Sequence, residues 1–194
     1  MTCEFNTVAL YFKQLKREVK LMILVTVGTQ LPFDRLIKAV DQWSSLNPHH
    51  EVEGQYGDSG YTPESFPGSS FLDVSEFNAK VARADLLIAH AGMGSIITAI
   101  EMMKPIVVMP RLARYGEHRN DHQLATVEKL GKLSNIHIAE NEAALPGAIE
   151  VALASQDLHS TEESASRISL ISMIQSFLAS NVGPQPLTNN LMST

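Results

Sequence analysis

The chain has 194 residues, of which 44% are hydrophobic and 19% charged, a composition that suits one globular domain with tails and argues against a disordered chain. The 15 lysines and arginines against 21 aspartates and glutamates give a net charge of −6, which argues against a partner such as nucleic acid. The single cysteine, Cys3, excludes an intrachain disulfide, and no apolar run approaches the ~20 residues of a membrane-spanning helix.

Short apolar segments alternate with amphipathic ones along the chain. In the first half we expect a strand at 22–27, a helix from Asp34, strands at 52–56 and 71–74, and a helix at 75–84 capped by Ser75. In the second half we expect a strand at 85–89, a helix from Ser95 to about Met103, a strand at 106–109, a helix capped by Asn120 or Asp121 and ending at Gly131, a strand at 136–139, a helix from Asn141 to about Ala154, and a helix over 160–180.

The expected strands are continuously apolar rather than alternating. This pattern is typical of strands that are covered on both sides, so the fold class is α/β, a Rossmann-like parallel sheet with helices on both faces. The segment Gly54–Ser70 is rich in Gly, Pro, Ser and Tyr and is expected to be a long loop that is either mobile or functional.

The order of expected strands and helices divides the chain into four segments. Residues 1–21 form an N-terminal extension, and Met22 is an alternative natural start. Residues 22–155 form the binding domain, 156–183 a C-terminal helix, and 184–194 a flexible tail. An apolar stripe on the C-terminal helix, Leu170, Ile171, Ile174, Phe177 and Leu178, and the Gly54–Ser70 loop are two candidate partner surfaces; the alternative for the stripe is packing on the same domain.

Three loops with unusual composition leave the carboxyl ends of expected strands, where open parallel sheets bind ligands. They are Gly28-Thr29-Gln30, the run from His90 to Ser95, and the run from Pro110 to Gln123. In the second loop, Gly92 and Gly94 allow a ligand to approach the backbone, and Ser95 at a helix start favours an anion. The alternative is a tight turn with a serine cap.

The third loop contains three arginines and two histidines. Each single arginine is better explained as solvated, whereas His122 and Gln123, in the first helical turn, are expected to point into the crevice. A metal site of His118, Asp121 and His122 is an alternative, but a helix capped at 120 or 121 argues against it, and we expect no metal and no cofactor.

Together these motifs resemble the glycosyltransferase family 28 C-terminal domain. The segments that carry the resemblance are Val25–Asp34, Ala89–Ser95, Lys104-Pro105 and Asn120–Gln123, in the correct order. The domain is the donor-binding, catalytic subunit of two-part UDP-sugar transferases, among them the dolichol-linked N-acetylglucosaminyltransferase and bacterial exopolysaccharide relatives. The resemblance implies the donor-binding half of a GT-B glycosyltransferase.

The resemblance also implies a set of residues that bind the UDP-sugar. A departure from the family pattern is Thr98, which stands where a glutamate usually contacts the ribose. Glu101 lies one turn further along the same helical face, so either Thr98 and Glu101 share the ribose contact or that contact is weaker. The predicted set is Gly28, Thr29, Gln30, His90, Gly92, Gly94, Ser95, Thr98, Glu101, Arg111, His122 and Gln123. No catalytic base is assigned, because the resemblance places it in the partner; for His90, orienting the loop is the preferred role.

The function that the resemblance implies is transfer of a sugar, with inversion, from a UDP-sugar to a lipid-linked acceptor in exopolysaccharide or glycolipid synthesis. A membrane-anchored partner subunit would bind the acceptor and hold the chain, which has no transmembrane segment of its own, at the cytoplasmic face of the membrane. The alternatives are a non-catalytic nucleotide-sugar-binding subunit and a self-contained sugar-nucleotide hydrolase or epimerase.

Overall fold

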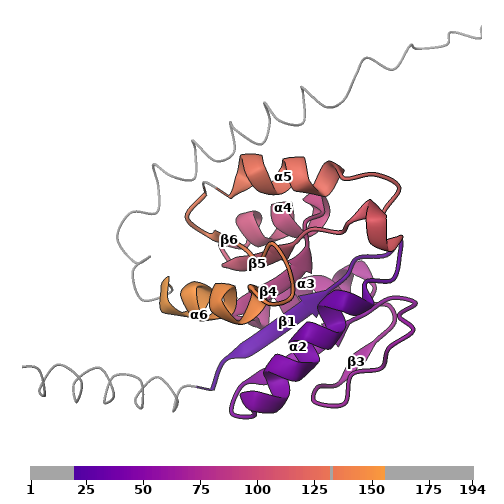
Figure 1. Ribbon diagram of the computed structural model, residues 1–194. Helices are drawn as coiled ribbons and strands as arrows, with labels where there is room; N and C mark the ends of the chain where they lie inside the picture. Colours follow the sequence, from indigo (N-terminus) through magenta and orange to yellow (C-terminus); the bar gives the residue numbers. More distant parts are fainter. Residues whose placement is uncertain (1–19, 132, 156–194) are drawn as a thin grey trace, which may run out of the picture. The chain divides into compact units, whose positions relative to one another are not determined.

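The structure, a computed structural model, describes residues 20–131 and 133–155. In this part of the chain six strands form a single sheet in which every neighbouring pair is parallel. The strands are β1 (Met22–Thr26), β2 (Glu51–Gln55), β3 (Gly68–Ser69), β4 (Leu86–His90), β5 (Ile106–Met109) and β6 (Ile136–Ile138). Their spatial order is β3-β2-β1-β4-β5-β6 (Figure 1), and the predicted Rossmann-like fold is confirmed.

Helices cover both faces of the sheet (Figure 1). On one face lie α2 (Asp34–Leu46) and α6 (Leu145–Ser155); on the other lie α3 (Val74–Arg83), α4 (Met93–Glu101) and α5 (His122–Leu130). Every residue of β1 and β5 is buried, as expected for central strands between two helical layers. The core beneath α2 and α6 is mostly aliphatic and also holds the aromatic rings of Phe33, Trp43 and Phe66; its fully buried aliphatic members include Ile23, Val25, Leu36, Ile37, Ile88, Val107 and Ile149.

The strand order reverses between β1 and β4. The chain runs outward from β1 through β2 to β3, returns to β4 beside β1, and continues through β5 to β6. The loops that follow β1 and β4 therefore diverge and leave a crevice at the carboxyl edge of the sheet. Two of the loops predicted to bind the ligand lie at this crevice.

The prediction of a strand at 71–74 is wrong. The third strand is β3, Gly68–Ser69, and Phe71 and Val74 are exposed. Gly68 pairs with Gly54 of β2, and a Cβ on Gly68 would lie only 2.3 Å from the Gly54 carbonyl oxygen. The strand therefore forms where two glycines let the backbones approach, and no apolar pattern marks it.

Asp73, rather than the predicted Ser75, caps α3. Its side chain accepts a hydrogen bond from the Glu76 amide at 2.8 Å, and the Glu76 carboxylate accepts one from the Asp73 amide. This reciprocal pair is a capping box, a signal that is present in the sequence as Asp-x-x-Glu. Val81 of this helix is buried, whereas Phe77 is only partly covered and faces the crevice.

Two carboxylates of α2 tie down the loop between β2 and β3. Asp41, 5% exposed, accepts hydrogen bonds from the Tyr61 hydroxyl and from the amides of Glu64 and Ser65. Asp34 accepts from the Ser59 hydroxyl at 2.6 Å. The expected long loop is therefore anchored along its length to a helix.

The remaining helix boundaries differ from the expected ones by a few residues. Helix α4 begins at Met93, two residues before Ser95, and α5 begins after Asp121 as predicted. Helix α6 begins at Leu145, because Asn141 instead closes a separate turn by accepting from the Ala144 amide. The expected extension 1–21, except for its last two residues, and the expected segments 156–183 and 184–194 lie outside the described residues.

Candidate functional site

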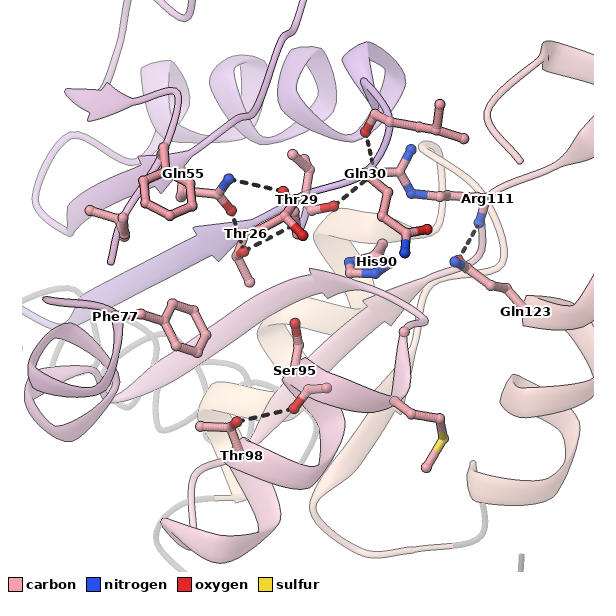
Figure 2. A pocket seen from close by; sticks show the side chains of 18 of the residues that line it. Thr26, Thr29, Gln30, Gln55, Phe77, His90, Ser95, Thr98, Arg111 and Gln123 are labelled. Carbon is pink, nitrogen blue, oxygen red and sulfur yellow. Dashed lines mark hydrogen bonds between the residues drawn. The ribbon is translucent and has the colours of Figure 1, made fainter. Parts of the chain in front are cut away.

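A cavity of about 620 Å³ opens at the switch point between β1 and β4. Most of the predicted binding residues line it and come from three loops and the start of two helices (Figure 2). They are Gly28, Thr29, Gln30, His90, Gly92, Gly94, Ser95, Thr98, Arg111 and Gln123. No aspartate or glutamate is among the described residues around this cavity, so its wall suits an anion.

Two predicted residues lie away from the cavity wall. Glu101 is the last residue of α4 and is exposed, and His122 is exposed on the first turn of α5. Gln123 is its immediate neighbour but is buried at the cavity, because successive helical residues point about 100° apart. The structure therefore brings Gln123 to the site and leaves His122 outside it.

The turn after β1 is built by two buried polar side chains that the sequence analysis missed. The Thr26 hydroxyl donates to Gln55 Oε1 at 2.6 Å and accepts from the Gly28 amide at 3.2 Å. Gln55 Nε2 then donates to the carbonyls of Gly28 and Ser70 at 2.9 and 3.0 Å (Figure 2). Polar residues inside otherwise buried strands were the available signal, since such groups need partners.

His90 lies between the two glycine turns. A Cβ on Gly28 would lie 2.7 Å from His90 Cε1, and a Cβ on Gly92 would lie 2.1 Å from His90 Nε2. Gly28 also has φ +73°, a conformation that other residues rarely adopt. Glycine is therefore needed at both positions because a larger side chain would clash with the His90 ring, and not only because a ligand must approach the backbone closely.

The environment of His90 keeps its ring neutral. Burial, and to a smaller extent the charges of Arg111 and His118, lower its pKa from 6.5 to about 4, against a hydrogen bond to the Thr26 backbone that raises it. Its Nδ1 is buried and makes no hydrogen bond within the described chain. The neutral imidazole therefore adds no positive charge to the cavity wall.

The N-terminus of α4 faces the cavity with its amides uncapped. Gly92 is the N-cap residue and has no side chain to satisfy the following amides of Met93, Gly94 and Ser95. The Ser95 hydroxyl points toward the cavity, and Thr98, one turn on, donates to the Gly94 carbonyl at 3.0 Å (Figure 2). Free amides and the helix dipole together favour a negatively charged group here.

Arg111 is the buried cation of the site. Its guanidinium donates to the carbonyls of Val27 and Pro32, each at 2.7 Å, and also to those of Leu31 and Glu117. Burial lowers its pKa to about 10, and the nearby Glu117 opposes that shift. Four of its N–H groups thus hold backbone, so Arg111 acts on a ligand mainly through its charge and through the loop it holds.

The rest of the third loop contributes one further side chain, His118, to the cavity wall. Arg114 is exposed and lies over the Tyr115 ring, away from the cavity. His118 Nδ1 is bonded to Asn120, and the Asp121 carboxylate accepts from the Ala113 amide. Within residues 20–131 and 133–155, no three His, Cys, Asp or Glu side chains gather as metal ligands, so the structure does not bring His118, Asp121 and His122 together as such a group.

The cavity also has an apolar side that the sequence analysis missed. Phe71, Leu72, Val74 and Phe77, from the loop before α3 and its first turns, line it together with Asn78. Phe71 and Val74 are 63% and 77% exposed, which is unusual for residues of this size. The apolar run around Asp73 was the signal, and its assignment to a strand concealed it.

The sequence model of the glycosyltransferase family 28 C-terminal domain matches residues 22–174. The chain belongs to this family. The match spans the whole described sheet and every residue around the cavity, so the family resemblance predicted from the motifs is confirmed.

Curated relatives of this family 28 domain carry nucleotide-sugar names. The UDP-N-acetylglucosamine transferase subunit ALG13 of Homo sapiens is 35% identical over 57% of this chain and 10% of its own length. The ALG13 subunit of Yarrowia lipolytica is 28% identical over 57% of this chain and 60% of its own length. The matched region thus spans from a tenth to three fifths of these two relatives.

Solved structures show the same fold at low sequence identity. The glycosyltransferase of kitacinnamycin matches 82% of this chain and 40% of its own, with a TM-score of 0.59 and 17% identity. SsfS6 from Streptomyces sp. SF2575, solved with thymidine diphosphate, matches 81% of this chain and 38% of its own, with a TM-score of 0.50 and 18% identity. None of the described helices of the family 28 domain has the length and apolarity to cross a bilayer.

Proposed function

We propose that this family 28 domain binds a UDP-sugar in the switch-point cavity and presents the sugar for transfer. The observation that carries the proposal is the meeting of two glycine turns and the uncapped start of α4 at one cavity without carboxylates. A diphosphate is the group that such a wall suits, because it accepts several backbone N–H bonds at once. The names of the curated relatives support UDP-N-acetylglucosamine as one donor to test.

The proposed pose follows the chemistry of the cavity walls. The diphosphate lies between the Gly28–Thr29 turn and Ser95, and the nucleobase lies against the apolar side formed around Leu72 and Phe77. The sugar extends toward Gln123, whose Oε1 already accepts from the Arg111 amide at 2.9 Å and whose Nε2 remains for a sugar hydroxyl. Thr98 lies near the ribose, with Glu101 too far along α4 to share that contact.

In the proposed reaction, an acceptor hydroxyl attacks the anomeric carbon from the face opposite the diphosphate. The new bond joins the acceptor oxygen to that carbon, the bond to the diphosphate oxygen breaks with its electron pair, and UDP leaves with inversion. The α4 amides and the Ser95 hydroxyl stabilise the charge that grows on UDP, and no metal or other cofactor is required in this proposal. The hydroxyl proton passes to a general base on the partner subunit.

The proposed acceptor is a lipid-linked sugar, and a membrane-anchored partner subunit binds it. This arrangement would place the chain at the cytoplasmic face of the membrane, in exopolysaccharide or glycolipid synthesis. The names of the human and Yarrowia lipolytica relatives, which call them transferase subunits, support a division of labour between two proteins.

The decisive test is which nucleotide-sugars raise the melting temperature of the purified chain. A UDP-sugar at a hundred times its dissociation constant should stabilise the fold by about 2.7 kcal/mol, a shift of several degrees, while ADP-glucose and GDP-mannose should have little effect. UDP should stabilise more than UMP because it carries the diphosphate. Equal shifts with UMP and UDP would contradict the proposed role of the two turns.

Ser95→Ala tests the position of the diphosphate. It removes one hydroxyl that points into the cavity, and the affinity for UDP should fall by about tenfold, since hydrogen bonds to charged groups contribute roughly 1.5–3 kcal/mol. Thr126→Ala, on the buried face of α5 outside the cavity wall, is the matched hydroxyl control. An unchanged UDP affinity in Ser95→Ala would mean that the ligand lies elsewhere.

A further inference from the structure

One cation joins the two ends of the loop that follows β1. The guanidinium of Arg111 donates hydrogen bonds to the Val27 carbonyl, at the start of this loop, and to the carbonyls of Leu31 and Pro32, at its end. Between these points Thr29 and Gln30 are exposed and have little packing of their own. The geometry of the intervening turn is therefore set at its base by a single side chain.

Arg111 is in turn held from three directions. Its planar group lies 4.8 Å from the centre of the Phe33 ring, its amide donates to Gln123 Oε1, and one Nη donates to the Glu117 carbonyl. None of the ion pairs in the described parts of the chain includes Arg111. The guanidinium charge is thus shared among carbonyl dipoles and stays unneutralised beside the cavity.

Behind Arg111 lies an ion pair that does not reach the cavity. The Glu117 carboxylate accepts from Arg35 Nε and Nη2, each at 2.9 Å, and from the Leu112 amide at 2.9 Å. The two side chains are only 12% and 9% exposed. Arg35 also donates to the Pro110 carbonyl. The ion pair is therefore hydrogen-bonded to the backbone of both neighbours of Arg111, Pro110 and Leu112.

We propose that Arg111, supported by the Arg35–Glu117 pair, is a positioning residue that fixes the Gly28–Leu31 loop for the donor diphosphate. The inference rests on the proposed function for the identity of the ligand, and on the described contacts for the loop. Its physical basis is preorganisation: a loop already held in its binding conformation loses less entropy when the nucleotide binds. Arginine supplies more than charge here, because its planar group can donate hydrogen bonds to both ends of the loop at once.

The variant Arg111→Lys separates these two contributions. A lysine keeps the positive charge but cannot reach both ends of the loop, because it has one nitrogen in place of a planar fork. In the full ligand-free chain, hydrogen exchange at the Gly28 amide, which donates to the Thr26 hydroxyl, should accelerate by at least about tenfold. The UDP dissociation constant from calorimetry should rise by a similar factor. Glu117→Ala should also speed exchange and weaken UDP binding. Glu117→Gln, which keeps one oxygen to accept from Arg35, should change both quantities less than Glu117→Ala does.

Ile149→Ala is the control for a loss of stability alone. Ile149 is fully buried in α6 and does not line the cavity. The variant should therefore lower the melting temperature without changing exchange at Gly28 or the affinity for UDP. Unchanged exchange in Arg111→Lys would overturn the positioning role, as would faster exchange with wild-type UDP affinity. If the wild-type chain fails to bind UDP, the proposed function is wrong, and the exchange data still decide whether Arg111 fixes the loop.

Discussion

At the scale of single residues, the site depends on glycines, which have no side chain, as much as on its polar side chains. The His90 ring occupies the space that a side chain at Gly28 or Gly92 would need. It thereby fixes the separation of the two turns that follow β1 and β4. This explains why glycine stands at the facing position in each turn.

Gly28→Ala should disturb this arrangement. A methyl group there meets His90 Cε1 at 2.7 Å and requires a strained φ of +73°, so unfolding free energy should drop by roughly 1–3 kcal/mol and UDP affinity should fall. Urea denaturation and calorimetry measure the two effects. Gly147→Ala is the control: it lies in α6 with open space around it and should stabilise the helix by about 0.5–1 kcal/mol. Equal behaviour of the two variants would count against the clash.

His90 should also make stability depend on pH. Because burial lowers its pKa from 6.5 to about 4, the unfolded chain binds more protons than the folded chain between these values. Stability should therefore fall as the pH drops through this window, with this histidine costing about 2 kcal/mol at pH 5 relative to pH 7.

The measurement is urea denaturation of wild type and His90→Gln at pH 7 and pH 5. The variant should lose less stability than wild type by that amount, since glutamine does not titrate. His50, whose pKa is also lowered by burial and by the His49 charge, remains in both proteins and cancels in the difference. Parallel pH dependences would show that His90 is not held neutral.

At the scale of elements, one helix anchors the longest loop of the described chain. Burial alone would raise the pKa of Asp41, but hydrogen bonds from Tyr61, Ser65 and Glu64 outweigh it and keep the pKa below the usual range. Asp41 is therefore a charged acceptor that holds the loop onto α2. This keeps the loop folded against the face of the sheet that α2 covers.

Asp41→Asn should release this loop. An amide can accept through only one oxygen, so at least one donor loses its partner and unfolding free energy should fall by roughly 1–3 kcal/mol. Urea denaturation measures the loss, and limited proteolysis within residues 57–67 should become faster. Asp58→Asn, an exposed aspartate of the same loop, should stay within about 0.5 kcal/mol of wild type. Wild-type stability in Asp41→Asn would contradict the anchoring role.

The elements that could be predicted from sequence were those whose apolar pattern reflects burial. The strands at 22–27 and 106–109 and the stripe of α2 fit this case, because each is covered by helices. The strand predicted at 71–74 failed because those apolar residues line a cavity rather than the core. The real strand, β3, is formed by glycine backbone, which leaves no side-chain pattern.

Some residues of the candidate site could also be predicted from local sequence signals, and others could not. The glycine turns and Ser95 were predictable, since backbone access and a helix start have local sequence signals. Gln55 and Phe77 were not, because their place at the cavity depends on the crossover that brings β2 and α3 beside β1. Arg111 was predicted at the site, but its bonds to Val27 and Pro32 join residues about eighty positions apart, which local patterns do not reveal.

At the scale of the whole molecule, the described wall of the cavity has the groups that the proposed donor needs, and it has no carboxylate that could activate an acceptor. The described residues around it supply amides, hydroxyls, two histidines and one arginine, with no carboxylate. His90 is buried between two glycines and kept neutral by a pKa of about 4, so its position and affinity for protons are poor for deprotonating a hydroxyl.

We therefore expect the purified chain to bind a UDP-sugar without transferring the sugar. Adding detergent-solubilised membranes from the source organism, as the supply of lipid acceptor and partner subunit, should yield radiolabelled glycolipid only when the chain is also present. The labelled donor alone with the chain should release no free sugar and no epimer, because the proposal places the activating base on the partner subunit and the described residues around the cavity include no carboxylate. Free sugar from the isolated chain would indicate a hydrolase and a changed sugar an epimerase, whereas binding without any transfer in the complete mixture would indicate a non-catalytic subunit. Since inversion requires attack from the face opposite the diphosphate, the linkage formed should have the anomeric configuration opposite to that of the donor.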